Sequence, residues 1–122
     1  MTVGFTPEQR RDVLLRNNGI CEICGTARAT DVHHRQPRGM GGARGQRAAR
    51  VNALSNALAL CRVCHDTVER DRPAAISHGW LVPRHEDPAD TPALLNVWLG
   101  RGPVLLGDDA TYTPVPYEVT IP

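Results

Sequence analysis

The sequence has no lysine, few aromatic residues and no long hydrophobic run. Its 122 residues include 14 basic side chains, all of them arginine, and the only aromatic residues are Phe5, Trp80, Trp98, Tyr112 and Tyr117. No apolar run approaches the ~18 residues that a membrane-spanning helix needs. The N-terminus has neither the basic nor the apolar region of a secretory signal. We therefore expect one small domain in the cytoplasm, where thiols stay reduced.

The charged residues are distributed unevenly. Residues 1–72 contain 12 arginines and 7 acidic residues, a net charge of +5, whereas residues 73–122 contain 2 arginines and 6 acidic residues, a net charge of −4. A basic half joined to an acidic tail favours a polyanionic partner on one face. The planar fork of arginine also suits phosphate. GC-rich codon usage is the alternative explanation for arginine in place of lysine.

The N-terminal region predicts a helix with defined ends. Thr6 can cap it, Pro7 fits its first turn, and Gln9 completes a capping box. Asn17, Asn18 and Gly19 end it. Further along, we expect short strands at residues 29–34 and 58–60 and a helix over residues 65–71.

The remaining residues, 73–122, are expected to form an irregular or β extension that packs on the core of residues 1–72. A strand is predicted at residues 80–82, residues 94–99 fit either a strand or a helix, and residues 104–106 and 112–119 predict a hairpin. The whole chain is therefore expected to adopt a small α+β fold.

The four cysteines form two pairs with the same spacing. Cys21 and Cys24 make one C-x2-C unit, and Cys61 and Cys64 make another after 36 intervening residues. Each pair can place two thiolates on one side of a tight turn, and two pairs complete the tetrahedral site that zinc prefers. A structural zinc ion would also stabilise a core this small. Two disulfides or four buried thiols are the alternatives.

A second pattern is interleaved with the cysteines. The adjacent His33 and His34 follow the first pair, Asn56 precedes the second pair, and His65 follows it directly. This pattern resembles the HNH endonuclease family, in its four-cysteine zinc-knuckle branch, and the small bacteriophage members in particular. The resemblance covers roughly residues 10–72.

The resemblance implies a ββα-metal (His-Me finger) motif stapled by the four-cysteine zinc site. It assigns His34 as the general base, His33 and His65 as ligands of a catalytic metal ion, and Asn56 as the residue that pins the loop and orients the base. These residue types suit phosphodiester hydrolysis. A neutral imidazole can activate water, and one divalent ion can neutralise the charge that develops on the phosphate.

Glu69 departs from the family pattern, in which a further histidine often stands four residues after the helix histidine. Because residues four apart share a helix face, His65 and Glu69 can reach one ion. A carboxylate ligand favours Mg²⁺ or Mn²⁺, with Ni²⁺ or Zn²⁺ as the alternatives. Glu69 could instead pair with Arg62, Arg72 or solvent.

The adjacent histidines raise a geometric question. Successive strand residues point to opposite faces, so His33 and His34 serve one site only if the strand bends or ends there. Pro37 and the glycines after it favour such a bend.

Residues 35–50 form a glycine-rich loop with five arginines and no acidic residue. We expect this loop to follow a phosphate backbone, and a solvated loop without a ligand is the alternative. The arginines are Arg35, Arg38, Arg44, Arg47 and Arg50.

The sequence thus predicts a metal-dependent endonuclease that nicks or cuts double-stranded DNA. The resemblance further implies phage genome processing, with packaging proteins as partners in the host cytoplasm. A non-catalytic zinc-knuckle module that binds DNA or acts as an adaptor is the main alternative. Such a module needs the cysteines and arginines but not His34, His65 or Asn56.

Overall fold

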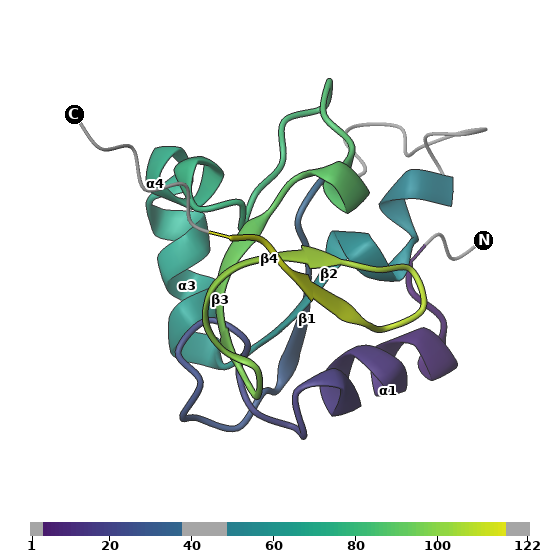
Figure 1. Cartoon of the computed structure of the whole chain (residues 1–122), viewed down its shortest axis with the longest axis vertical. Helices are drawn as coiled ribbons and strands as arrows, with labels where there is room; N and C mark the ends of the chain where they lie inside the picture. The colour runs from purple at the N-terminus through teal and green to yellow at the C-terminus, as the bar shows by residue number, and fades with distance from the viewer. Residues whose placement is uncertain (1–3, 38–48, 117–122) are drawn as a thin grey trace.

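A computed structural model describes residues 4–37 and 49–116 (Figure 1). It is a small α+β fold with two antiparallel sheets. The helices are α1 (Pro7–Arg16), α3 (Arg62–Arg70) and α4 (Arg72–Ser77), with short 3₁₀ helices η1 (Leu54–Asn56) and η2 (Pro88–Asp90). The strands are β1 (Asp31–His34), β2 (Ala57–Leu60), β3 (Ala93–Val97), β4 (Gly100–Leu106) and β5 (Tyr112–Pro114). None of the described helices is long and apolar enough to span a membrane.

Helix α1 begins and ends where the sequence predicts. The Thr6 hydroxyl accepts a hydrogen bond from the Gln9 N–H at 3.1 Å, and the Gln9 side chain accepts one from the Thr6 N–H at 2.9 Å. These reciprocal bonds satisfy two N–H groups that have no partner within the helix. Asn18 and Gly19 then take positive φ angles of 57° and 79°, which ends the helix.

Strands β1 and β2 form the central sheet, which separates two hydrophobic clusters. The pairing runs from Asp31 opposite Leu60 to His34 opposite Ala57. Ala57 and Ala59 pack in the cluster with α1, whereas Leu58 and Leu60 pack in the cluster with α3. Figure 1 accordingly shows α1 on one side of β1 and β2, and α3 with α4 on the other.

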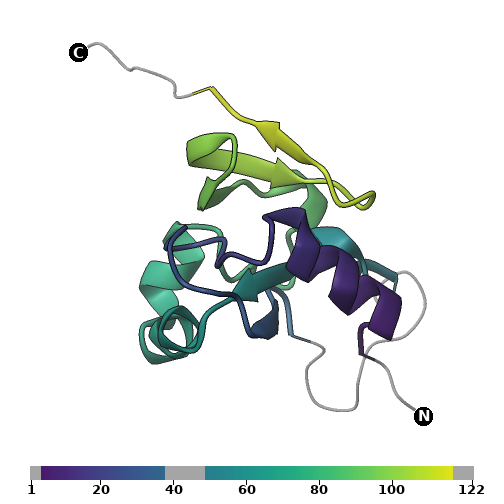
Figure 2. The same ribbon diagram turned by 90° about the horizontal axis from the view of Figure 1, so that it is seen from below.

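The C-terminal extension forms the second sheet, in the order β3-β4-β5. Figure 2 shows it as a layer over the rest of the molecule. The side chains of Leu95, Val104 and Leu106 lie in the same hydrophobic cluster as Leu58 and Leu60. The described residues 73–116 thus share a core with the described part of residues 1–72.

Several predicted elements differ from the structure in type or bounds. Strand β3, residues 93–97, covers most of the ambiguous residues 94–99. The predicted hairpin is present as β4 and β5, but its second strand ends at Pro114, and residues 117–119 lie outside the described part. Helix α3 begins three residues earlier than predicted because the Cys61 sulfur accepts the Cys64 N–H and caps it.

The predicted strand at residues 80–82 is wrong. Gly79 takes a φ of 75°, and the N–H groups of Trp80 and Leu81 both donate to the Ala75 carbonyl at the end of α4. The Val82 N–H donates to the Arg35 carbonyl. These backbone groups are therefore used to close a turn and are not available for a sheet.

Candidate functional site

The four cysteines form one compact group, here called the four-cysteine cluster. The sulfurs of Cys21, Cys24, Cys61 and Cys64 lie within 4.8 Å of one another, and none of them is in a disulfide. Cys21 and Cys61 are buried, and the other two are partly exposed. Four thiols at this spacing are compatible with a metal ion and consistent with a structural zinc site.

Backbone and hydroxyl donors surround these sulfurs. The Cys24 sulfur accepts from the Thr26 hydroxyl and the Ala27 N–H, both at 3.5 Å, and the Cys61 sulfur accepts from the Cys64 N–H at 3.5 Å. Partial burial raises the pKa of Cys24, but the hydrogen bonds from Thr26 and Ala27 outweigh it and lower that pKa to about 6. The thiolate, which is the form that binds metal, is thereby favoured at neutral pH for Cys24, whereas burial raises the pKa of Cys21 and of Cys64.

A second group, here called the histidine–glutamate cluster, joins β1 to α3. One ligand atom each from His33, His65 and Glu69 lies within 4.8 Å of the others. The His33 and His65 rings meet edge to face with their centroids 5.2 Å apart. His33 is buried, the His65 side chain is 25% exposed and that of Glu69 is 53% exposed. The three residues predicted as ligands of a second metal therefore come together at an accessible edge.

His33 is held in the neutral form that can bind a metal. Burial lowers the pKa of His33 to about 4 because the charged ring loses its hydration. Its Nε2 lies 3.0 Å from the Trp80 carbonyl oxygen. The segment after α4, which does not form the predicted strand, thus anchors this histidine.

Asp31 is a residue that the sequence interpretation missed. Its Oδ2 lies 2.8 Å from His65 Nδ1 and 3.5 Å from Arg62 Nη1. The hydrogen bond from His65 lowers the pKa of Asp31. The available signal was the strand period, since residues 31 and 33 share one face of β1 and that face meets α3.

Of the two alternatives given for Glu69, the pairing with Arg72 is observed, whereas binding of an ion stays a prediction. Glu69 lies in the histidine–glutamate cluster, and its Oε2 is also 3.1 Å from Arg72 Nη1. Both side chains are about half exposed. A surface pair of this kind contributes only ~0–1 kcal/mol, so it does not hold Glu69 away from an ion.

His34 lies on the opposite face of β1 from His33. Its ring stacks on Phe5 with centroids 4.1 Å apart and an interplanar angle of 13°. Strand β1 ends at His34 and the chain bends at Arg35 and Gln36, but His34 itself still pairs with Ala57, so the bend comes too late to turn His34 to the face of His33. The expectation that a bend brings both histidines to one face is therefore wrong.

Asn56 is fully buried and pins the chain that follows β1. Its side-chain oxygen accepts from the Gln36 N–H at 2.7 Å, and its amide donates to the carbonyls of Gln36 and Val51 at 2.9 and 2.8 Å. The predicted pinning of the loop is thus seen directly. Orientation of His34 by Asn56 stays a prediction.

Arg35 was predicted to contact DNA, and this prediction is wrong. The side chain is fully buried, and burial lowers its pKa to about 10. Its guanidinium donates to four carbonyl oxygens at 2.7–3.0 Å, those of Ser55, Gly79, Pro88 and Thr91. These hydrogen bonds hold the end of α4 and the helices η1 and η2 around the end of β1.

The other loop arginines divide into two groups. Arg50 is partly exposed, and its Nε lies 3.9 Å from an Asp87 carboxylate oxygen. Arg38, Arg44 and Arg47 lie outside the described residues.

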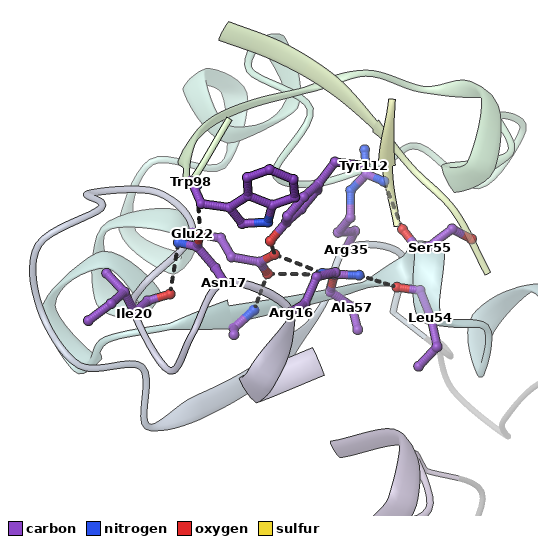
Figure 3. A network of polar contacts seen from close by, with 11 residues as sticks. Arg16, Asn17, Ile20, Glu22, Arg35, Leu54, Ser55, Ala57, Trp98 and Tyr112 are labelled. Carbon is purple, nitrogen blue, oxygen red and sulfur yellow. Dashed lines mark hydrogen bonds and ion pairs between the residues drawn. The ribbon is translucent and has the colours of Figure 1, made fainter. Parts of the chain in front are cut away.

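A buried ion pair supports the first cysteine turn (residues 21–24) (Figure 3). Glu22 is fully buried, and its two carboxylate oxygens each accept from Arg16 at 2.8 Å. The Ala59 N–H donates to the same carboxylate at 2.7 Å, and the Tyr112 hydroxyl also donates to it. The turn is thereby tied to α1, β2 and β5, a connection that no local sequence pattern indicates.

No protein-family model, curated protein or solved structure matches the chain. What the protein does must therefore be inferred from the chemistry of the two clusters and the residues beside them.

Proposed function

We propose that this protein is a metal-dependent endonuclease of the HNH kind that hydrolyses phosphodiester bonds in double-stranded DNA. The observation that carries the proposal is the histidine–glutamate cluster, in which His33, His65 and Glu69 lie within 4.8 Å of one another. Its residues come from β1 and from α3, and α3 directly follows β2, the antiparallel partner of β1. That order of elements is the one expected for a ββα-metal motif.

The residues of this cluster fit a divalent ion. Two imidazoles and one carboxylate suit Mg²⁺ or Mn²⁺ when further ligands come from water or phosphate, with Ni²⁺ or Zn²⁺ as alternatives. The exposure of Glu69 leaves room for those additional ligands. When bound, such an ion neutralises charge on the reacting phosphate and assists departure of the 3′ oxygen. In the same proposal, the four-cysteine cluster holds a structural zinc ion.

His34 is proposed as the general base. A neutral imidazole can take a proton from the attacking water. In the part of the chain that the structure describes, β1 pairs with β2 alone, so its other edge is free of strands. A phosphodiester lying along that edge can be approached by His33 from one face and by His34 from the other. Stacking on Phe5 fixes the His34 ring.

Double-stranded DNA is proposed as the substrate because residues 35–50 contain five arginines and no acidic residue. With Arg35 buried, phosphate binding falls to Arg50 and to the loop arginines Arg38, Arg44 and Arg47. Phage genome processing, nicking or double-strand cutting, and packaging partners in a host cytoplasm follow from the family resemblance alone.

The placement of His34 also favours a second candidate function. If the stack on Phe5 exists only for packing, the chain is a non-catalytic zinc module that binds DNA or joins other proteins. Both functions use the four-cysteine cluster and the arginine-containing loop of residues 35–50. Only a catalytic role of His34 in β1 distinguishes the endonuclease from the non-catalytic module.

A plasmid-cleavage assay with Mg²⁺, Mn²⁺ or Ni²⁺ tests the proposal. We expect cleavage by the wild type and a loss of about 10²–10⁴ in rate for His34→Ala, the usual range for loss of a general base. His85→Ala is the matched control, because His85 is exposed and lies outside both clusters. Equal rates for His34→Ala and His85→Ala would remove His34 from catalysis. No cleavage by the wild type with any of the three ions would favour the non-catalytic module.

A further inference from the structure

We propose that Asp31 is a positioning residue, which fixes His65 in one tautomer while the Trp80 carbonyl fixes His33 in the opposite one. Each ring is then held with one unprotonated nitrogen available to the same ion. The inference rests on the metal site of the proposed function, but it concerns groups that are in place before any ion binds.

The tautomer of His65 follows from its partner. Its Nδ1 lies 2.8 Å from Asp31 Oδ2. An ionised carboxylate can only accept a hydrogen bond, so Nδ1 must carry the proton. Nε2 is then the bare nitrogen, and it is the atom through which His65 can bind metal.

The tautomer of His33 follows in the same way but with the opposite result. Its Nε2 lies 3.0 Å from the Trp80 carbonyl oxygen, which is also only an acceptor. Nε2 must therefore carry the proton, and Nδ1 is left bare. Because the two partners engage different ring nitrogens, the two histidines present different atoms to the cluster.

Both acceptors are themselves held in position. The Thr30 hydroxyl donates to Asp31 Oδ1 at 3.1 Å, and Arg62 pairs with Oδ2 at 3.5 Å. The Trp80 indole N–H donates to the Leu94 carbonyl at 2.8 Å, which anchors the residue whose carbonyl meets His33. With both of its oxygens engaged, Asp31 supports a ligand and is not one itself.

This arrangement lowers the cost of binding an ion. A ligand histidine whose other nitrogen has a fixed acceptor needs no change of tautomer or ring orientation, and loss of such an acceptor typically weakens metal binding by about 10- to 100-fold. Asp31 is a stronger acceptor than the Trp80 carbonyl because its oxygen is charged. The His65 ring is also more exposed than the His33 ring, so fewer packing contacts fix its orientation and the hydrogen bond to Asp31 matters more for it.

The first measurement is the tautomeric state of the wild type. Nitrogen-15 NMR of the zinc-loaded full chain, with no other divalent ion, reports which nitrogen of each ring carries the proton. The measurement is made at about pH 8, above the ordinary imidazole pKa of about 6.5. We expect His65 protonated at Nδ1 and His33 protonated at Nε2. A His65 ring protonated at Nε2 would overturn the proposal without any variant having to fold.

The second measurement is the affinity for Mn²⁺, followed by titration calorimetry. We expect Asp31→Ala to raise the Mn²⁺ dissociation constant by about 10- to 100-fold. Asp31→Asn, which keeps a neutral acceptor oxygen, should lose less affinity. Asp66→Ala is the matched control, since Asp66 also neighbours Arg62, at 4.0 Å, but in the described part of the chain its carboxylate makes no hydrogen bond or ion pair with the His65 ring. If Asp31→Ala and Asp66→Ala weaken Mn²⁺ binding equally, the effect is one of net charge and the proposal fails.

Neither measurement depends on DNA cleavage. A wild type with the expected tautomers that binds Mn²⁺ but cuts no DNA would overturn the nuclease proposal and still support the role of Asp31. A wild type that cuts DNA, with Asp31→Ala binding Mn²⁺ at wild-type affinity, would overturn the role of Asp31 and leave the nuclease proposal standing.

Discussion

The four-cysteine cluster and the histidine–glutamate cluster share helix α3 but differ in how they are enclosed. Cys61 caps this helix and Cys64 lies in its first turn, while His65 and Glu69 project from the following turns. The sulfurs are partly or fully buried, whereas the second cluster opens toward solvent through Glu69. One short helix therefore serves a closed site and an open site.

The charged residues that support the two clusters also differ in burial. The first cysteine turn is backed by the fully buried pair of Glu22 and Arg16, and the histidine–glutamate cluster is backed by the partly exposed Asp31. A closed site with four thiols has no position left for substrate, whereas an open site with three ligands does. This difference is the reason why the proposed function assigns the fold to the four-cysteine cluster and the chemistry to the histidine–glutamate cluster.

The largest effect is expected from removing one thiol. Cys21→Ser should lose the zinc together with the folded state, because metal binding and folding are coupled in such sites. Elemental analysis and circular dichroism would measure both. Val63→Ser is the control, since Val63 lies between Cys61 and Cys64 but is exposed. A well-folded wild type without zinc would contradict the assignment of the four-cysteine cluster as a structural metal site.

Next in size is the effect of mild chelation on activity. Brief treatment with EDTA should remove the ion of the open cluster and abolish cleavage, while the zinc among four thiolates stays bound. Cleavage and circular dichroism measured on the same sample separate the two outcomes, and added Mn²⁺ should restore cleavage. Unfolding that precedes the loss of cleavage would show that the two sites are not independent.

A matched pair of substitutions compares the groups behind the clusters. Glu22→Gln should lower the free energy of unfolding by about 3–5 kcal/mol, since it leaves the buried charge of Arg16 without its partner. Asp31→Asn makes the same chemical change at a partly exposed carboxylate and should cost about 0–1 kcal/mol. Urea denaturation measures both free energies of unfolding. Equal decreases for Glu22→Gln and Asp31→Asn would show that the two carboxylates do not differ in their contribution to stability.

A smaller loss of stability than that of Glu22→Gln is expected at Tyr112, and it depends on pH. Burial and the adjacent charge of Glu22 raise the pKa of this phenol above its usual value near 10. A raised pKa in the folded state gives stability that is present below pH 10 and is lost as the pH rises toward the folded-state pKa. Tyr112→Phe should therefore be less stable by roughly 1–2 kcal/mol at neutral pH, and the difference should shrink in urea melts above pH 10. A difference that does not depend on pH would contradict this linkage.

Local patterns in the sequence predicted much of the fold and much of the site. The capping box of α1, the equal spacing of the cysteines and the four-residue step from His65 to Glu69 each depend on neighbours within one turn. Such patterns can be interpreted without knowing the fold.

The features that the sequence did not predict depend on residues far away in the chain. The charge of Arg35 suggested a role in DNA binding, but its guanidinium donates hydrogen bonds to carbonyl groups 20–56 positions away in the chain. Glu22 looks like a surface residue of a tight turn until Arg16 and β5 enclose it. The face of β1 on which His34 lies is set by its pairing with Ala57 of β2, because the chain bends only after His34.

The contact between Glu22 and Tyr112 also sets an order in time while the chain is being synthesised. The two residues are 90 positions apart, and a ribosome that adds ~5–20 residues per second needs roughly 5–18 s to cover that distance. During this interval Glu22 can pair with Arg16, but β5, whose Tyr112 completes the enclosure of the pair, has not yet been made. We therefore expect the nascent cysteines to stay in water for seconds, open to oxidation and to competing thiol-binding metals.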